Sequence, residues 1–146
     1  MRTATLVPSY PEFLPALVPR ILLIDSDRRF VAEFRQAARE SRLAVDAFAS
    51  VVFLDSQRNW TYDLVILDLT TVDKAFVKEI CRDIRMAHRD VPILFIAGTN
   101  ANGIPGIARR AGTGFSNKAM GADAVLFDAL RLYSVESKAE LMEEFA

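Results

Sequence analysis

The chain has 146 residues, of which 51% are hydrophobic and 25% are charged, and its formal net charge is −1. This length is enough for one domain with a sizeable core, and the composition excludes disorder over most of the chain. A net charge so close to zero provides no basic surface for a phosphate backbone, so we expect no direct nucleic-acid partner. A single cysteine and a single histidine exclude an internal disulfide and a zinc site built from these residue types, which fits a reducing cytoplasm.

The first 19 residues form a segment that is apolar but contains four prolines. Proline prevents a helix of useful length and interrupts each apolar run that a signal peptide would need. No stretch of the sequence approaches the roughly 20 apolar residues of a membrane span, so we expect no membrane contact. We interpret residues 1–19 as a proline-rich arm, with packing on its own domain or on a partner as the alternative, and residues 20–146 as one domain.

After the arm, short apolar runs alternate with helical patterns. The predicted helices cover residues 27–40, 50–58 and 73–88. The predicted strands cover residues 21–24, 43–48, 64–67, 93–96 and 124–126. Alternation of this kind indicates an α/β fold, in which a parallel sheet is doubly wound by right-handed crossovers.

The connection over residues 98–120 contains most of the glycines of the chain. A regular helix through Gly112 and Gly114 would lose about 1 kcal/mol per glycine relative to alanine, so we expect a broken or shifted helix there. The glycine spacing matches no P-loop or dinucleotide-binding motif. Further on, Ser137 and Glu140 have the spacing of a capping box, which predicts that a new short helix begins at this point.

Two of the predicted strands end in an aspartate. Asp25 follows the strand over residues 21–24, and Asp68 follows the strand over residues 64–67. Because the carboxyl ends of parallel strands meet at the same edge of a sheet, we expect these carboxylates to converge on one cation or phosphate.

Taken together, five stretches of the chain resemble the receiver domains of two-component response regulators, over about residues 20–133. The stretches are residues 21–25, 62–68, 80–85, 91–96 and 121–126. The resemblance implies a flavodoxin-like, five-stranded sheet with strand order 2-1-3-4-5. It also implies a non-enzymatic, cytoplasmic signalling role. The implied partner is a histidine kinase or a downstream signalling protein, met through the face of helix 4, strand 5 and helix 5, and a homodimer is a candidate assembly.

The same resemblance assigns chemistry to the aspartates. It implies that Asp68 is a candidate phosphoacceptor and that Asp25, Asp27 and Asp68 are candidate ligands of Mg²⁺. Transfer of a phosphoryl group depends mainly on positioning and on charge neutralisation, which is why carboxylates, a metal and a further cation are needed.

Several positions depart from the pattern of the family. Its second acidic residue falls on Ser26, and its hydroxyl at the end of strand four falls on Ala97. Its lysine after strand five falls on Asp128, and its switching aromatic residue falls on Val125. A site without a lysine carries excess negative charge, which a phosphoryl group would increase. Thr99 or Lys118 could substitute only through a shift of register.

Three hypotheses follow for function. We predict an atypical, pseudo-receiver-like protein-interaction module with weak or no phosphorylation, and the alternative is a receiver phosphorylated on Asp68. A third hypothesis is a phosphatase similar to the haloacid dehalogenases, with Asp25 as nucleophile and Asp27 as acid/base. It fits less well, because Arg29 stands where that family has a small or β-branched residue and the predicted helix leaves no room for its flap.

Overall fold

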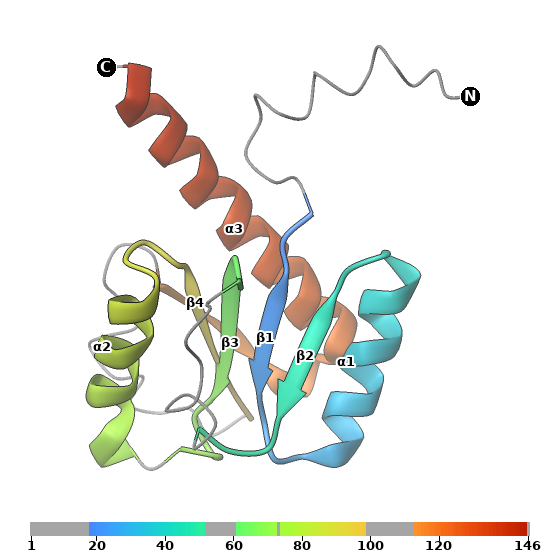
Figure 1. Cartoon of the computed structure of the whole chain (residues 1–146). Helices are drawn as coiled ribbons and strands as arrows, with labels where there is room; N and C mark the ends of the chain where they lie inside the picture. Colours follow the sequence, from blue (N-terminus) through green and yellow to red (C-terminus); the bar gives the residue numbers. More distant parts are fainter. Residues whose placement is uncertain (1–17, 52–60, 73, 99–112, 146) are drawn as a thin grey trace.

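The computed structural model describes residues 18–51, 61–72, 74–98 and 113–145 of the chain (Figure 1). Its strands are β1 (Ile21–Ile24), β2 (Val45–Phe48), β3 (Leu64–Asp68), β4 (Ile93–Ala97) and β5 (Thr113–Asn117). Its helices are α1 (Arg28–Glu40), α2 (Val77–Ala87) and α3 (Ala122–Phe145), with short 3₁₀ turns η5 (Lys74–Phe76) and η7 (Lys118–Met120). The strands form one parallel sheet in the order β2-β1-β3-β4-β5, which confirms the predicted fold class.

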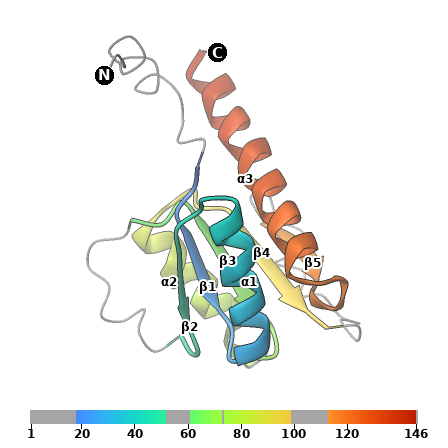
Figure 2. The same cartoon turned by 90° about the vertical axis from the view of Figure 1, so that its right-hand side faces the viewer.

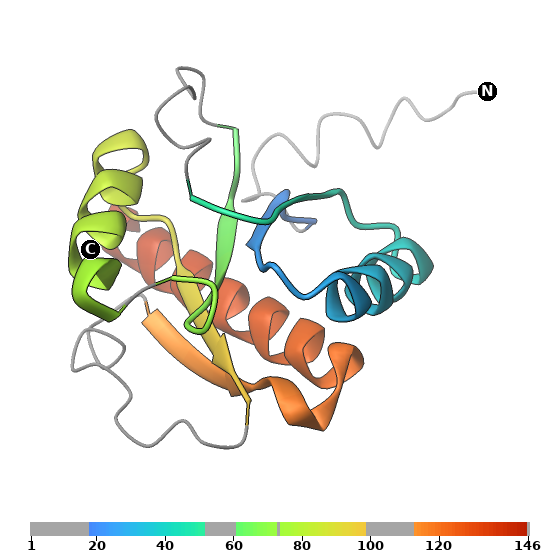
Figure 3. The ribbon, with the colours of Figure 1, turned by 90° about the horizontal axis from the view of Figure 1, so that it is seen from below.

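Helices cover both faces of the sheet, as Figures 1 and 2 show. Side chains of the central strands alternate between two apolar clusters, one under α2 and one under α1 and α3. In β1, for example, Leu22 and Ile24 face α2, whereas Ile21 and Leu23 face the other two helices. All four are fully buried, which is why this strand reads as a continuous apolar run. Figure 3 views the edge of the sheet at which the strands end.

Helix α1 is determined by its cap and its apolar stripe. The carboxylate of Asp27 accepts hydrogen bonds from the backbone N–H groups of Arg29 and Phe30, and so fixes the start of the helix. Phe30 and Phe34 are buried at helical spacing and pack on the sheet, each stabilising the fold by about 1.5–3 kcal/mol through burial. The helix predicted over residues 27–40 is therefore confirmed.

The predicted fifth strand is wrong, because residues 124–126 lie inside α3. Val125 and Leu126 belong to an apolar stripe that also contains Ala122 and Ala129, and this i, i+3, i+4, i+7 spacing is that of a helix. A short apolar run within the stripe resembles a buried strand when it is read alone. The true last strand, β5, lies before η7.

Gly114 lies where β5 packs against α3. A Cβ atom at this position would lie 3.4 Å from a side-chain carbon of Leu94 and 3.5 Å from one of Leu132, which is ordinary van der Waals contact, so the packing would accept an alanine. Gly114, which was expected to break a helix, lies in a strand.

Three smaller predictions also need comment. Ser137 lies in the interior of α3, so no new helix begins there. The helix predicted over residues 73–88 is preceded by the 3₁₀ turn η5, and Phe76 in that turn is 52% exposed. The helix proposed over residues 50–58 and the connection over residues 99–112 lie mostly or wholly outside the described residues. No described helix is both long enough and apolar enough to cross a membrane.

Candidate functional site

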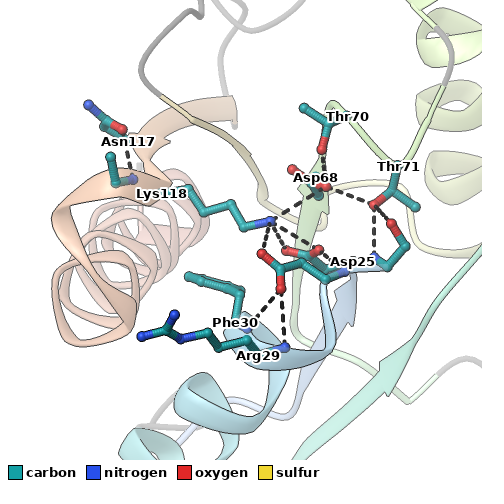
Figure 4. A network of polar contacts seen from close by, with 11 residues as sticks. Asp25, Arg29, Phe30, Asp68, Thr70, Thr71, Asn117 and Lys118 are labelled. Atoms are coloured by element: carbon teal, nitrogen blue, oxygen red, sulfur yellow. Dashed lines mark hydrogen bonds and ion pairs between the residues drawn. The ribbon is translucent and has the colours of Figure 1, made fainter.

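The cation of the site is Lys118, whereas the sequence resemblance assigned the lysine position to Asp128. Lys118 follows β5 directly, so its side chain reaches the sheet edge at which β1 and β3 end (Figure 4). Its Nζ atom lies 2.8 Å from Asp25 Oδ2, 3.6 Å from Asp27 Oδ2 and 3.7 Å from Asp68 Oδ2. The three predicted carboxylates are thus brought together, and the prediction that their site lacks a lysine is wrong.

The two residues assigned to the ends of the misplaced strand lie elsewhere. Val125 and Asp128 both belong to α3, so they cannot stand at the aromatic and lysine positions of strand five. Val125 is a core residue, and the Asp128 carboxylate accepts a hydrogen bond of 2.7 Å from the hydroxyl of Ser116 on β5. The helical spacing of the residues around Val125 was the signal that could have prevented this error, because it moves the strand to residues 113–117 and puts Lys118 after it.

Asp25 is the most deeply embedded carboxylate of the cluster, with a fully buried side chain. Its Oδ1 atom accepts hydrogen bonds from the backbone N–H of Asp27 at 2.8 Å and from Lys118 Nζ at 3.1 Å. Burial raises the pKa of Asp25 above its ordinary value, although the hydrogen bonds from Lys118 and Asp27 act in the opposite direction.

Asp27, a candidate metal ligand, also caps a helix. Its carboxylate is half exposed and caps α1. The backbone N–H of Phe30 is the main reason that the pKa of Asp27 lies below its ordinary value, and the charge of Lys118 adds to the effect. Its side chain is therefore held at the helix start rather than aimed at Asp68.

Asp68 is buried and joins a chain of hydroxyl groups. Its Oδ2 atom accepts hydrogen bonds from Thr70 Oγ1 at 2.6 Å and from Thr71 Oγ1 at 2.7 Å. The Thr71 oxygen in turn accepts the backbone N–H of Ser26 at 2.9 Å and lies 3.0 Å from the Ser26 hydroxyl. We call Asp68, Thr71 and Ser26 the hydroxyl bridge, since their hydrogen bonds link the end of β3 to the segment that follows β1. The Oδ1 atom of Asp68 is buried and has no hydrogen-bond partner among the described residues.

The surroundings of Lys118 keep it charged. Its side chain is only 12% exposed, and its ammonium group lies 4.9 Å from the centre of the Phe30 ring. Burial disfavours the ammonium form, but the hydrogen bond to Asp25 and the charges of Asp68 and the other carboxylates outweigh it and raise the pKa of Lys118. On the neighbouring strand, Ala97 is buried and offers no hydroxyl group.

In the described part of the chain, most carboxylate oxygens of this site are occupied by protein donors, and the exception is Asp68 Oδ1. Within the described ranges, no group of three or more His, Cys, Asp or Glu side chains is arranged to hold a metal ion. The Asp27 carboxylate caps a helix, Ser26 supplies no carboxylate, and Asp68 Oδ2 already accepts two hydroxyl hydrogens. The cation that lies among these oxygens is the Lys118 ammonium.

Comparison with known proteins places the fold. No protein-family model matches the sequence, and no curated protein matches it. Among solved structures, a response regulator receiver protein from Burkholderia phymatum is 22% identical with a TM-score of 0.63, over 80% of this chain and 95% of that chain. CheY4 of Vibrio cholerae, a chemotaxis response regulator, is 18% identical with a TM-score of 0.65, over 79% of this chain and 98% of that chain. NtrX from Brucella abortus is 17% identical with a TM-score of 0.74, over 88% of this chain and 30% of that chain. At these identities the likeness establishes a shared receiver fold.

Proposed function

We propose that this chain is a cytoplasmic, receiver-type signalling domain of a two-component system that acts through protein contacts, with weak or no phosphorylation of Asp68. The observation that carries the proposal is the hydroxyl bridge, in which Asp68 is linked through Thr71 to Ser26, the residue at the position where the resemblance expects an acidic side chain. The fold shared with receiver structures supports the signalling class.

The charge balance supports the same conclusion. The site holds three carboxylates and one ammonium group, and a phosphoryl group would add a charge of about −1.5 to −2. Phosphoryl transfer needs that charge to be neutralised. Ser26 supplies no carboxylate to bind a neutralising Mg²⁺, and Ala97 supplies no hydroxyl group for a phosphoryl oxygen.

The positions of the other carboxylates argue against the phosphatase hypothesis. A phosphatase mechanism would need Asp25 as an accessible nucleophile, but its side chain is fully buried against Lys118. Asp27, the acid/base of that hypothesis, is committed to capping α1.

The proposed contact surface is the face of β5 and α3, the last strand and helix. Phe127 and Val135 are exposed apolar residues on α3, at 66% and 59%. The resemblance implies that a partner binds at this face, and the partner would be a kinase, a downstream signalling protein or a second copy of the chain.

A second candidate function is a phosphorylated receiver. Two observations favour it: Lys118 Nζ lies 3.7 Å from Asp68 Oδ2, and Asp68 Oδ1 has no partner in the described part of the chain. A cation near an acceptor carboxylate is what phosphoryl transfer requires.

Incubation with acetyl phosphate and Mg²⁺, followed by intact mass measurement, separates the two candidates. We expect no adduct on the wild-type chain. The double variant Ser26→Asp, Ala97→Thr should gain an adduct, and adding Asp68→Asn to it should abolish the gain. An adduct on the wild-type chain that disappears in Asp68→Asn would establish the second candidate instead.

A further inference from the structure

A groove lies between α1 and the end of β2, on the opposite side of α1 from α3. It has a volume of about 310 Å³. Val31 and Ala32 line it from the helix, and Ala47 and Phe48 line it from the strand. Figures 1 and 2 show these two elements side by side at the edge of the fold. These four residues make their part of the lining apolar, and none of them belongs to the carboxylate site, although Asp25 and Ser26 of that site also border the groove.

The charged side chains that line this groove are arginines, apart from one carboxylate that is already paired. Arg28 and Arg35 border it from α1, and within the described ranges neither side chain has a hydrogen bond or an ion pair, although the charge of Arg35 contributes to lowering the pKa of Asp46. Asp25 also borders the groove, but its charge is paired with Lys118 at 2.8 Å. Two guanidinium groups without a direct ion pair, beside an apolar lining, are complementary to a ligand that is both acidic and apolar.

The charge of the surrounding helix points in the same direction. Helix α1 contains four arginines and two glutamates, a net charge of +2 in a chain whose formal net charge is −1. No described acidic residue forms an ion pair with an arginine of α1. This helix thus attracts an anionic partner, although the chain as a whole does not.

We propose that this groove, which we call the α1–β2 groove, binds an acidic peptide segment of a protein partner that carries an apolar side chain between two carboxylates. Arg28 and Arg35 are separated by two helical turns, about 10.5 Å along the axis. An extended polyproline II segment places residues i and i+3 on one face about 9 Å apart, so two carboxylates at this spacing reach both guanidinium groups. The apolar residue between them packs on Val31 and Ala47.

The test is a titration of the full chain with the peptide acetyl-Gly-Glu-Leu-Pro-Glu-Gly-amide, followed by amide NMR shifts. Saturable shifts should appear at residues 28–35 and 45–49. The variant Arg28→Glu, Arg35→Glu should weaken binding by at least about tenfold, because both charge contacts become repulsive. Ala32→Trp, at an exposed helix position, should abolish binding by filling the groove without a change of charge.

The matched control is Arg39→Glu, Arg82→Glu, which makes the same charge change at two exposed arginines outside the groove. It should bind the peptide as the wild type does. Equal weakening in both double variants, shifts located elsewhere, or equal shifts with free glutamate at the same carboxylate concentration would each overturn the proposal. None of these outcomes depends on whether Asp68 is phosphorylated.

Discussion

The two ends of the sheet contain the same kind of ion pair in different surroundings. At the end where the strands begin, Arg20 Nη2 lies 3.1 Å from Asp46 Oδ2, and their side chains are 46% and 41% exposed. At the end where the strands finish, Lys118 pairs with Asp25 at 2.8 Å, and their side chains are 12% and 0% exposed. Water screens the first pair and not the second, so burial decides which pair can strongly affect stability or a neighbouring group.

The exposed pair has a supporting role that suits its position. Tyr62 donates a hydrogen bond of 2.7 Å to Asp46, and the guanidinium group of Arg20 lies 5.3 Å from the centre of the Tyr62 ring. These residues tie together the segments that lead into β1 and β3 and the start of β2. Nothing in this exposed cluster concentrates charge in a low-dielectric site, so we assign it no chemistry.

The largest predicted effect is that of Lys118→Met. The substitution leaves the buried Asp25 carboxylate without its cation and brings it into uncompensated repulsion with Asp68, so the free energy of unfolding at pH 7 should fall by about 3 kcal/mol. Chemical denaturation measures this loss. The double variant Asp25→Asn, Lys118→Met should lose less than the single variant, and a single-variant loss below about 1 kcal/mol would show that the buried pair is not coupled as the distances indicate.

A smaller effect is expected for the cap of α1. Asp27→Ala should cost about 1 kcal/mol, whereas Asp27→Asn should cost little at pH 7 because asparagine also caps helices. The folded-state pKa of Asp27 is lowered, so its ionised form contributes stability that is present above its ordinary value of 3.8 and is lost as the pH falls below it. The slope of stability against pH in this acid range should therefore be flatter in Asp27→Asn, and an unchanged slope would contradict the assignment.

The smallest effect is expected at the exposed pair. Arg20→Met should change the free energy of unfolding by no more than about 1 kcal/mol, and added salt should reduce the difference further. A loss as large as that of Lys118→Met, measured in the same denaturant series, would remove the contrast between the two ends of the sheet.

Tyr62 offers a spectroscopic check on the same end. Burial, followed by the hydrogen bond to Asp46, raises the pKa of Tyr62 to about 12. An ultraviolet titration of tyrosinate should show that Tyr62 ionises at a higher pH in the wild-type chain than in Asp46→Asn. Equal titration of both chains would show that the hydrogen bond does not hold the phenol proton.

The sheet was predictable because its central strands are buried on both faces. The short apolar runs that end in Asp25 and Asp68 are typical of buried parallel strands. Because both end at the same edge of the sheet, they also predicted where the candidate site lies. The cap of α1 by Asp27 and the stripe of Phe30 and Phe34 were equally clear.

The last strand was not predictable in the same way. β5 contains one glycine and three polar residues, and its only buried position is a serine, so its pattern is weak. The run around Val125 is more apolar and was mistaken for it, and this error displaced the lysine by ten residues, from Lys118 to Asp128. The hydroxyl bridge could not be foreseen either, since Ser26 and Thr71 are 45 residues apart and only the folded chain brings them together.

The measurement that tests the central claim most directly is the effect of Mg²⁺ on thermal unfolding. A site closed by the hydroxyl bridge should not bind the ion, so millimolar Mg²⁺ should leave the Tm of the wild-type chain unchanged. The variant Ser26→Asp replaces one end of the bridge by a carboxylate, and its Tm should rise with Mg²⁺ because binding to the folded state alone stabilises it. A rise in the wild-type Tm that is lost in Asp25→Asn and in Asp68→Asn would contradict a metal-free site.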